Sequence, residues 1–212
     1  MPLESAQDRT ITGDMKLRNK FSIEPEFILL LSVAILIFGD AMTCVLLIAA
    51  LIHEAGHLMA IWVAGGHITA VRLTGAGAEI SYASKGGNWT EVLCASGGPL
   101  TGIGACFLLL RMFPECSIFD TLFSVGLCVN LWNLLPMYPL DGGRILYYAC
   151  LMFLTEKHSR CICVAVFWIC EAILIILAIY MLIHKVSLIL LPAVISLLIC
   201  GCKMSLPGVK LT

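Results

Sequence analysis

Long apolar runs, separated by short polar or glycine-rich breaks, are the main pattern along this chain. Most of these runs approach the 20 or so residues that an α-helix needs to cross a bilayer, and the first is shorter. We predict spans at 27–39, 41–64, 91–110, about 118–135, 161–183 and 186–202. The expected fold class is therefore an all-α membrane protein with about six transmembrane helices.

The breaks between the early runs contain glycine. Gly39-Asp40 predicts a tight turn between the first two runs, and Gly65-Gly66 ends the second. Residues 67–90 alternate in part between apolar and polar positions and include several glycines. This pattern predicts a small β-hairpin or a loop at the membrane surface between the second and third spans.

The third and fourth runs differ in their small residues and prolines. Gly98 and Gly102 form a GxxxG pair in the third, a pattern that favours close packing against another helix. Pro136 and Pro139 stop the fourth, because proline cannot continue a helix. The last two runs are separated only by His184-Lys185 and predict a helical hairpin.

The polar ends and the basic residues predict the domain boundaries and the orientation. We expect a cytosolic tail at 1–26, a membrane core at 27–203 and a short cytosolic tail at 204–212. With six spans and a cytosolic N-terminus, all of the 13 basic residues except Arg111 and Lys185 fall on the inner side, as the positive-inside rule requires. Both termini would then be cytosolic.

The composition supports a membrane protein and excludes one class of partner. Apolar residues make up 60% of the chain and charged residues 13%, against roughly 45–50% and about 25% in soluble domains. Mean hydropathy is +0.98. The formal net charge of -1 gives no basic surface for nucleic acid, so we expect no nucleic-acid partner.

Eleven cysteines are present, most of them inside apolar runs. Thiols in such positions usually behave as small hydrophobic side chains. Cys161 and Cys163 could be interpreted as a metal pair, but their spacing is not the two-residue gap of structural zinc sites, and the packing interpretation is favoured.

The second run contains HEAGH, with His53, Glu54 and His57 in an otherwise apolar helix. Histidines four residues apart lie on one helix face and can bind the same ion, while Glu54 points elsewhere and can contact a water bound to that ion. The alternative is a chance HExxH sequence. Inside a membrane, unpaired charged groups each cost roughly 2.5–3.5 kcal/mol, which favours a shared metal ion.

A third ligand is needed, and Asp141 is the leading candidate. It follows the broken fourth run, and Gly142-Gly143 permit backbone conformations that other residues resist. Asp141 could equally cap a helix that begins near Gly142, and the local sequence alone leaves both interpretations open.

HEAGH in a predicted membrane helix, GGP at the third span and NLLPMYPLDGGR after the fourth together resemble the site-2 protease family of intramembrane zinc metalloproteases. The short first span running into HExxH resembles its sporulation-type branch, the stage IV factor B-like proteins. The similarity covers residues 21 to 203.

The resemblance implies a Zn²⁺ ion held by His53, His57 and Asp141, with Glu54 as general base, toward the cytosolic side of the membrane. It also implies that Asn133, the asparagine of the family's NxxPxxPxDG pattern, lies near the site and orients substrate or stabilises an oxyanion. A packing role for Asn133 beside the broken helix is equally compatible with the sequence.

This chain departs from better-known members in three respects. It shows no CBS module after the last span and no PDZ domain between spans, so we expect any such regulation to be absent or supplied by another protein. Residues 67–85 match the family's membrane-associated hairpin only loosely. Glu171 lies inside the fifth span, where it is a gate, a partner for a substrate side chain or, more simply, a protonated side chain bonded to a neighbouring helix.

The expected function is cleavage of a membrane-associated regulatory precursor, such as a transcription-factor or anti-sigma precursor, with a regulatory membrane partner as a further expectation. A catalytically inactive zinc-binding relative is the alternative. A transporter with a broken helix is a third interpretation, but no internal repeat is visible.

Overall fold

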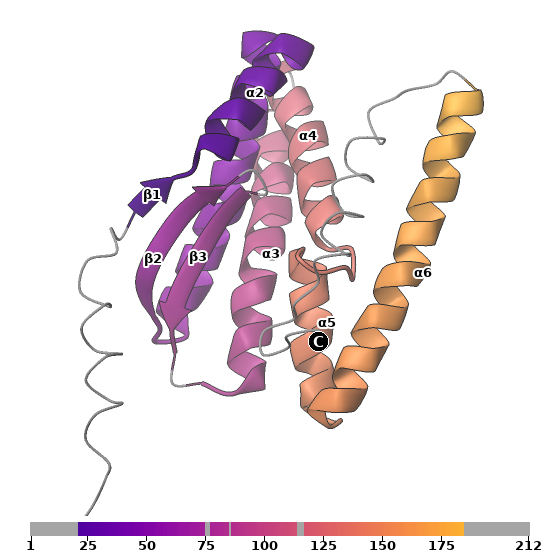
Figure 1. Ribbon diagram of the computed structural model, residues 1–212. Helices are drawn as coiled ribbons and strands as arrows, with labels where there is room; N and C mark the ends of the chain where they lie inside the picture. Colours follow the sequence, from indigo (N-terminus) through magenta and orange to yellow (C-terminus); the bar gives the residue numbers. More distant parts are fainter. Residues whose placement is uncertain (1–20, 75–76, 85, 114–116, 185–212) are drawn as a thin grey trace, which may run out of the picture.

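The computed structural model describes residues 21–74, 77–84, 86–113 and 117–184, which are mostly helical with one small sheet (Figure 1). In chain order the elements are β1 (Phe21–Ile23), α2 (Pro25–Val63), β2 (His67–Thr74), β3 (Gly77–Ala83), α3 (Asn88–Met112), α4 (Ser117–Asn133), α5 (Asp141–Leu151) and α6 (Glu156–Ile183). The predicted sixth span and C-terminal tail lie outside these residues, as does most of the predicted N-terminal tail.

Helix α2 contains the first two apolar runs and changes direction between them. Gly39 interrupts it with φ 80° and ψ 168°, a conformation that favours glycine. The Glu24 amide donates to the Leu73 carbonyl at 2.8 Å, so α2 begins beside one end of β2 and ends close to the other. A straight 39-residue helix would be about 58 Å long, whereas an eight-residue strand is about 26 Å long. The chain must therefore turn back at Gly39, where the sequence predicts a turn.

The sheet contains the predicted hairpin and one further strand. β2 and β3 pair antiparallel, with Val71 opposite Ile80, and β1 pairs parallel with β2, so the strand order is β1-β2-β3. Within the described residues β3 is an edge strand. The hairpin predicted between the second and third spans is present in a mostly helical protein, and the sheet has one strand more than predicted, since β1 lies in a region that the sequence assigns to a polar tail.

Three helices of the described part, α2, α3 and α6, are long and apolar enough to cross a membrane. Many of their large apolar side chains are exposed, including Leu36 at 84% and Trp62 at 78%. Apolar surface of this extent is expected where helices face lipid. These findings support a mostly helical membrane protein, and a total of six spans stays a prediction.

Helix α3 packs directly against α2 because glycines meet at the crossing. A Cβ on Gly56 would lie 2.4 Å from the carbonyl oxygen of Gly97, and a Cβ on Gly97 would lie 2.7 Å from that of Gly56. Neither position has room for a side chain. The small-residue half of α3 therefore brings its backbone into contact with the helix that contains HEAGH.

The chain breaks between α4 and α5, and this break positions Asp141 as the first residue of α5. A Cβ on Gly142 would lie 2.2 Å from the carbonyl oxygen of Leu134, so α5 begins in tight contact with the end of the preceding segment. Behind the break, Met137 packs on Phe167 of α6, and both are fully buried. The broken segment is therefore held from two sides.

Candidate metal centre

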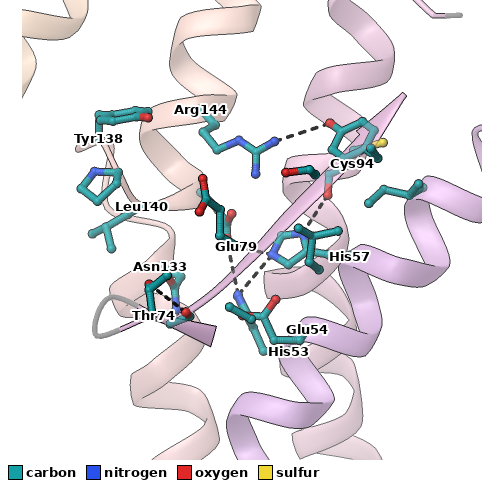
Figure 2. Close-up of a pocket in the computed structure, with 18 of the residues that line it drawn as sticks. His53, Glu54, His57, Thr74, Glu79, Cys94, Asn133, Tyr138, Leu140 and Arg144 are labelled. Atoms are coloured by element: carbon teal, nitrogen blue, oxygen red, sulfur yellow. Dashed lines mark hydrogen bonds and ion pairs between the residues drawn. The ribbon is translucent and has the colours of Figure 1, made fainter. Parts of the chain in front are cut away.

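A cavity of about 510 Å³ lies between α2, β3, α5 and the segment that leads into α5 (Figure 2). Its wall includes every residue that the sequence singles out for the site, namely His53, Glu54, His57, Asn133 and Asp141. Strand β3 contributes the consecutive residues 77–82. The two sequence motifs thus meet at one cavity that is closed on one side by the hairpin.

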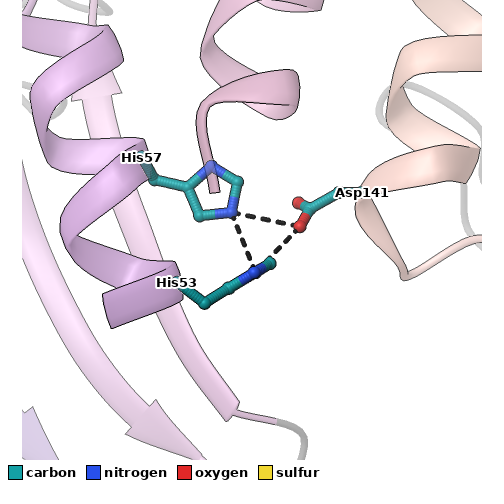
Figure 3. A group of neighbouring side chains, drawn as sticks. All are labelled: His53, His57 and Asp141. Carbon is teal, nitrogen blue, oxygen red and sulfur yellow. Dashed lines mark hydrogen bonds and ion pairs between the residues drawn. The ribbon is translucent and has the colours of Figure 1, made fainter. Parts of the chain in front are cut away.

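His53, His57 and Asp141 converge on one point in this wall (Figure 3). The Nε2 atom of each histidine lies 3.1 Å from Oδ2 of Asp141, and the two Nε2 atoms are 3.3 Å apart. All three side chains are buried. Of the two interpretations of Asp141, these contacts match the ligand geometry, and the N-cap position of α5 is taken by Leu140.

Hydrogen bonds behind the two histidines determine how the rings are oriented. Nδ1 of His57 lies 2.8 Å from the carbonyl oxygen of Cys94, which can only accept, so Nδ1 is the donor. Nδ1 of His53 lies 2.9 Å from Oδ1 of Asn130, whose amide nitrogen donates to the Gly126 carbonyl. In neutral imidazoles both Nε2 atoms therefore direct a lone pair at the carboxylate oxygen.

Three acceptor atoms facing one another need a proton or a cation between them, and a metal ion satisfies all three at once. Two imidazole nitrogens and a carboxylate oxygen are a donor set of catalytic zinc sites. Tetrahedral ligands about 2.0–2.1 Å from zinc would lie about 3.3 Å from each other, close to the 3.1 and 3.3 Å found here. The residues present therefore fit a zinc ion.

Glu54 lines the cavity next to this cluster but is not part of it. Its position after His53 turns it about 100° away around the helix. The backbone N–H of Ala78 on β3 donates a hydrogen bond to the Glu54 carboxylate. The carboxylate is therefore held between the metal centre and the hairpin, where it faces the cavity.

Asn133 also lines the cavity, but the hydrogen bonds and ion pairs of His53, His57 and Asp141 within the described residues do not include it. Its Nδ2 donates to the carbonyl oxygen of Val129 at 3.0 Å, one turn earlier on α4. This bond matches the packing role that the sequence leaves open, while the position in the wall is compatible with a substrate contact. Both interpretations of Asn133 remain.

Asn130 is a site residue that the sequence reasoning missed. It is 1% exposed, it orients His53, and a Cβ on Gly102 would come within 2.1 Å of its Oδ1. An amide in the middle of an apolar run is costly without a partner, and this cost is the signal that could have identified it. The family pattern drew attention to Asn133, three residues later, instead.

A chain of hydrogen bonds links the hairpin to α3 and α5 at the edge of the cavity. Nη2 of Arg144 donates to the Tyr82 hydroxyl at 3.4 Å, and that hydroxyl donates to the Glu91 carboxylate. Burial and the bond to Glu91 raise the pKa of Tyr82, so the phenol stays protonated and remains a donor. This chain ties β3 to the helix that begins with Asp141.

Glu171 lies away from the cavity, on the face of α6 that carries Phe167 and Leu174. It is 1% exposed, and neither carboxylate oxygen has a hydrogen-bond partner in the described part of the chain. The expected bond to a neighbouring helix is therefore not found among the described residues.

The eight cysteines in the described part of the chain are free thiols. Cys161 and Cys163 do not belong to a metal-binding group of described residues.

Comparisons with known proteins bear on the fold. No protein-family model matches the sequence, and no match is found among curated proteins. The structure is similar to that of the Site-2 Protease from Methanocaldococcus jannaschii, with a TM-score of 0.66 and 21% sequence identity, over 92% of this chain and 95% of that chain. The chain therefore has the fold of a site-2 protease, the family that its two motifs resemble.

Proposed function

We propose that this protein is an intramembrane zinc metalloendopeptidase. The observation that carries the proposal is the convergence of two imidazole nitrogens and one carboxylate oxygen within 3.1–3.3 Å of each other, beside Glu54 in the wall of a cavity. The site-2 protease fold supports the same function. We further propose, from the short first apolar run, that the chain belongs to the sporulation-type branch.

His53, His57 and Asp141 would hold the zinc ion, with their outer hydrogen bonds keeping the imidazole rings in place. Such an ion supplies a Lewis acid and lowers the pKa of a bound water toward about 7. Proton transfer and substrate orientation are assigned to other side chains of the cavity.

Glu54 is the proposed general base. It would take the proton of the attacking water on a carboxylate oxygen and deliver it to the amide nitrogen that leaves, as general acid-base catalysis requires. The hydrogen bond from Ala78 keeps the carboxylate facing the cavity. Asn133 is proposed to orient the substrate or to donate to the oxyanion, if its amide is released from the Val129 carbonyl.

The edge of β3 is the proposed binding surface for the substrate backbone. Residues 77–82 line the cavity in sequence, and β3 is an edge strand of the described sheet. An extended segment can pair with such an edge through main-chain hydrogen bonds. A helical membrane segment that unwinds there would have its backbone groups satisfied while a peptide bond is presented to Glu54.

The proposed substrate is a membrane-associated regulatory precursor, such as a transcription-factor or anti-sigma precursor, and a regulatory membrane partner is proposed as well. The bias of Lys and Arg supports cytosolic termini and an active site toward the cytosol.

The test is Glu54→Gln in the purified, zinc-loaded protein, with a synthetic peptide library in detergent as substrate. We expect zinc to be retained and cleavage to fall at least 1,000-fold, on the order of what loss of a general base costs. Glu79→Gln is the matched control, because Glu79 also lines the cavity but pairs with Arg72. Cleavage that survives Glu54→Gln would reject the proposal, and wild-type protein that binds zinc but cleaves nothing would indicate an inactive relative.

A further inference from the structure

Arg144 is a half-buried cation in the wall of the cavity, three residues after Asp141 on α5. Its hydrogen bond to the Tyr82 hydroxyl is long, at 3.4 Å. Among the described residues no carboxylate lies within 4.0 Å of its guanidinium group. An arginine has five N–H donors, so the described residues use only a small part of the hydrogen-bonding capacity of Arg144.

The nearest acidic group in the hydrogen-bond chain does not pair with Arg144 directly. Glu91 accepts from the Tyr82 hydroxyl, and the same hydroxyl oxygen accepts from Arg144. The phenol therefore lies between the two charges. Because Tyr82 stays protonated, its hydroxyl is a neutral hydrogen-bond acceptor for the guanidinium and supplies no negative charge.

The three carboxylates in the cavity wall already have other partners. Asp141 faces the two imidazoles, and Glu54 accepts from the backbone of Ala78. Glu79 lies 3.7 Å from Arg72 across the hairpin. None of the described carboxylates pairs with Arg144, and its guanidinium group can therefore take an anion from a molecule that enters the cavity.

We propose that Arg144 binds a carboxylate of the substrate, the side chain of an aspartate or glutamate close to the bond that is cleaved. This inference rests on the proposed function and names a substrate feature for the same cavity. The planar guanidinium fork is suited to a carboxylate, which it can bind through two parallel N–H···O bonds. Burial in the wall strengthens such a pair relative to one in water.

The position of Arg144 limits where in the substrate this acidic side chain lies. Three residues along a helix advance by about 4.5 Å, so the backbone of Arg144 lies within one turn of that of Asp141. An extended substrate advances by about 3.3 Å per residue. The acidic residue should therefore occur within about two positions of the cleaved bond.

The experiment is to digest a synthetic peptide library, randomised at internal positions, with the purified zinc-loaded protein in detergent and to identify the cleaved bonds by mass spectrometry. For the wild type we expect Asp or Glu to be enriched about tenfold within two positions of the cleaved bond, a factor typical of one charged hydrogen bond. Arg144→Gln should abolish the enrichment, and Arg144→Glu should replace it by an enrichment of Lys and Arg.

Two variants separate substrate binding from a structural role. Tyr82→Phe removes the hydroxyl to which Arg144 donates, and Arg72→Gln removes a half-buried arginine of the hairpin that does not line the cavity. Both should keep the acidic preference. If Tyr82→Phe abolishes it as Arg144→Gln does, Arg144 acts by holding the hairpin, and the inference is wrong.

The remaining outcomes also decide the question. Cleavage without an acidic preference, or with the same preference in wild type and Arg144→Glu, overturns the inference and leaves the proposed function intact. Cleavage at a fixed distance from peptide C-termini would assign Arg144 to the terminal carboxylate and reject the side-chain partner. If the zinc-loaded wild type cleaves no peptide, both the proposed function and this inference are rejected.

Discussion

The cavity has two walls that are built differently. On the helical side, α2 and α3 are in backbone contact with each other, the start of α5 is in backbone contact with residues 134–138, and buried hydrogen bonds fix the two histidines. On the other side, β3 is an edge strand whose links to the helices include the Ala78 bond to Glu54 and the Tyr82 hydroxyl. The difference matches the proposed roles, in which the helical wall holds an ion in one geometry and the edge of β3, which pairs with no further strand among the described residues, receives the substrate.

The largest effect should come from adding a methyl group next to Nε2 of His57. A Cβ on Gly98 would lie 2.3 Å from Nε2 of His57, so Gly98→Ala must displace a metal ligand. We expect zinc affinity to fall at least 100-fold, the upper end of what disturbed ligand orientation costs, as measured by competition with a chelator. Gly104→Ala, on the same helix but with open space, is the control. Equal zinc affinity in the two variants would show that the helical wall is not tightly constrained.

A somewhat smaller effect is expected at Asn130. In Asn130→Leu the Nδ1 of His53 loses its acceptor, and zinc affinity should fall by about 10 to 100-fold. Asn133→Leu is the matched control for zinc binding, since Asn133 contacts a backbone carbonyl of its own helix rather than a ligand. Cobalt substitution gives a second readout, because a reoriented imidazole changes the visible spectrum. If the spectrum is the same in wild type and Asn130→Leu, Asn130 does not orient His53.

On the hairpin wall, Tyr82→Phe should affect cleavage without affecting zinc. It removes the hydroxyl that joins β3 to Arg144 and Glu91. One hydrogen bond contributes roughly 0.5–1.5 kcal/mol, so we expect a roughly three- to tenfold loss of cleavage rate and the same zinc affinity. A parallel loss of zinc would mean that the hairpin and the metal centre form one rigid unit.

The smallest effect on the site is expected at Glu171, which is buried away from the cavity. A buried carboxyl with no partner among the described residues is destabilising, so Glu171→Leu should raise the stability by about 1 kcal/mol and leave zinc affinity and cleavage unchanged. Thermal unfolding in detergent would measure the first, and the zinc and peptide assays the second. Lower stability or lost cleavage would show that Glu171 has a functional partner.

The sequence predicted the parts of the site that depend on local spacing. His53 and His57 share a helix face because they are four residues apart, and Asp141 follows a proline break that ends a helix. The role of Asn130 could not be predicted from local spacing. It depends on the hydrogen bond to His53 of α2 and on the packing of Gly102 of α3, and both residues are distant from Asn130 in the sequence. The turn at Gly39 was predictable for the same local reason as the histidines.

The short strand β1, in contrast, could not be predicted from local sequence. Three residues carry too little periodicity to identify a strand, and β1 forms only because β2 offers it a free edge. Similarly, no pattern in the sequence could indicate that Arg144 would lack a carboxylate partner. The absence of such a partner depends on the other groups that Glu54, Glu79 and Asp141 contact in the folded chain.

X-ray absorption at the zinc edge of the purified wild-type protein tests the central claim most directly. The account predicts one zinc per chain, bound by nitrogen and oxygen atoms at about 2.0–2.1 Å, with scattering from two imidazole rings and none from sulfur. His53→Ala should remove one of the two imidazole contributions. Sulfur ligands at about 2.3 Å, or a spectrum that does not change in His53→Ala, would contradict a metal centre built from His53, His57 and Asp141.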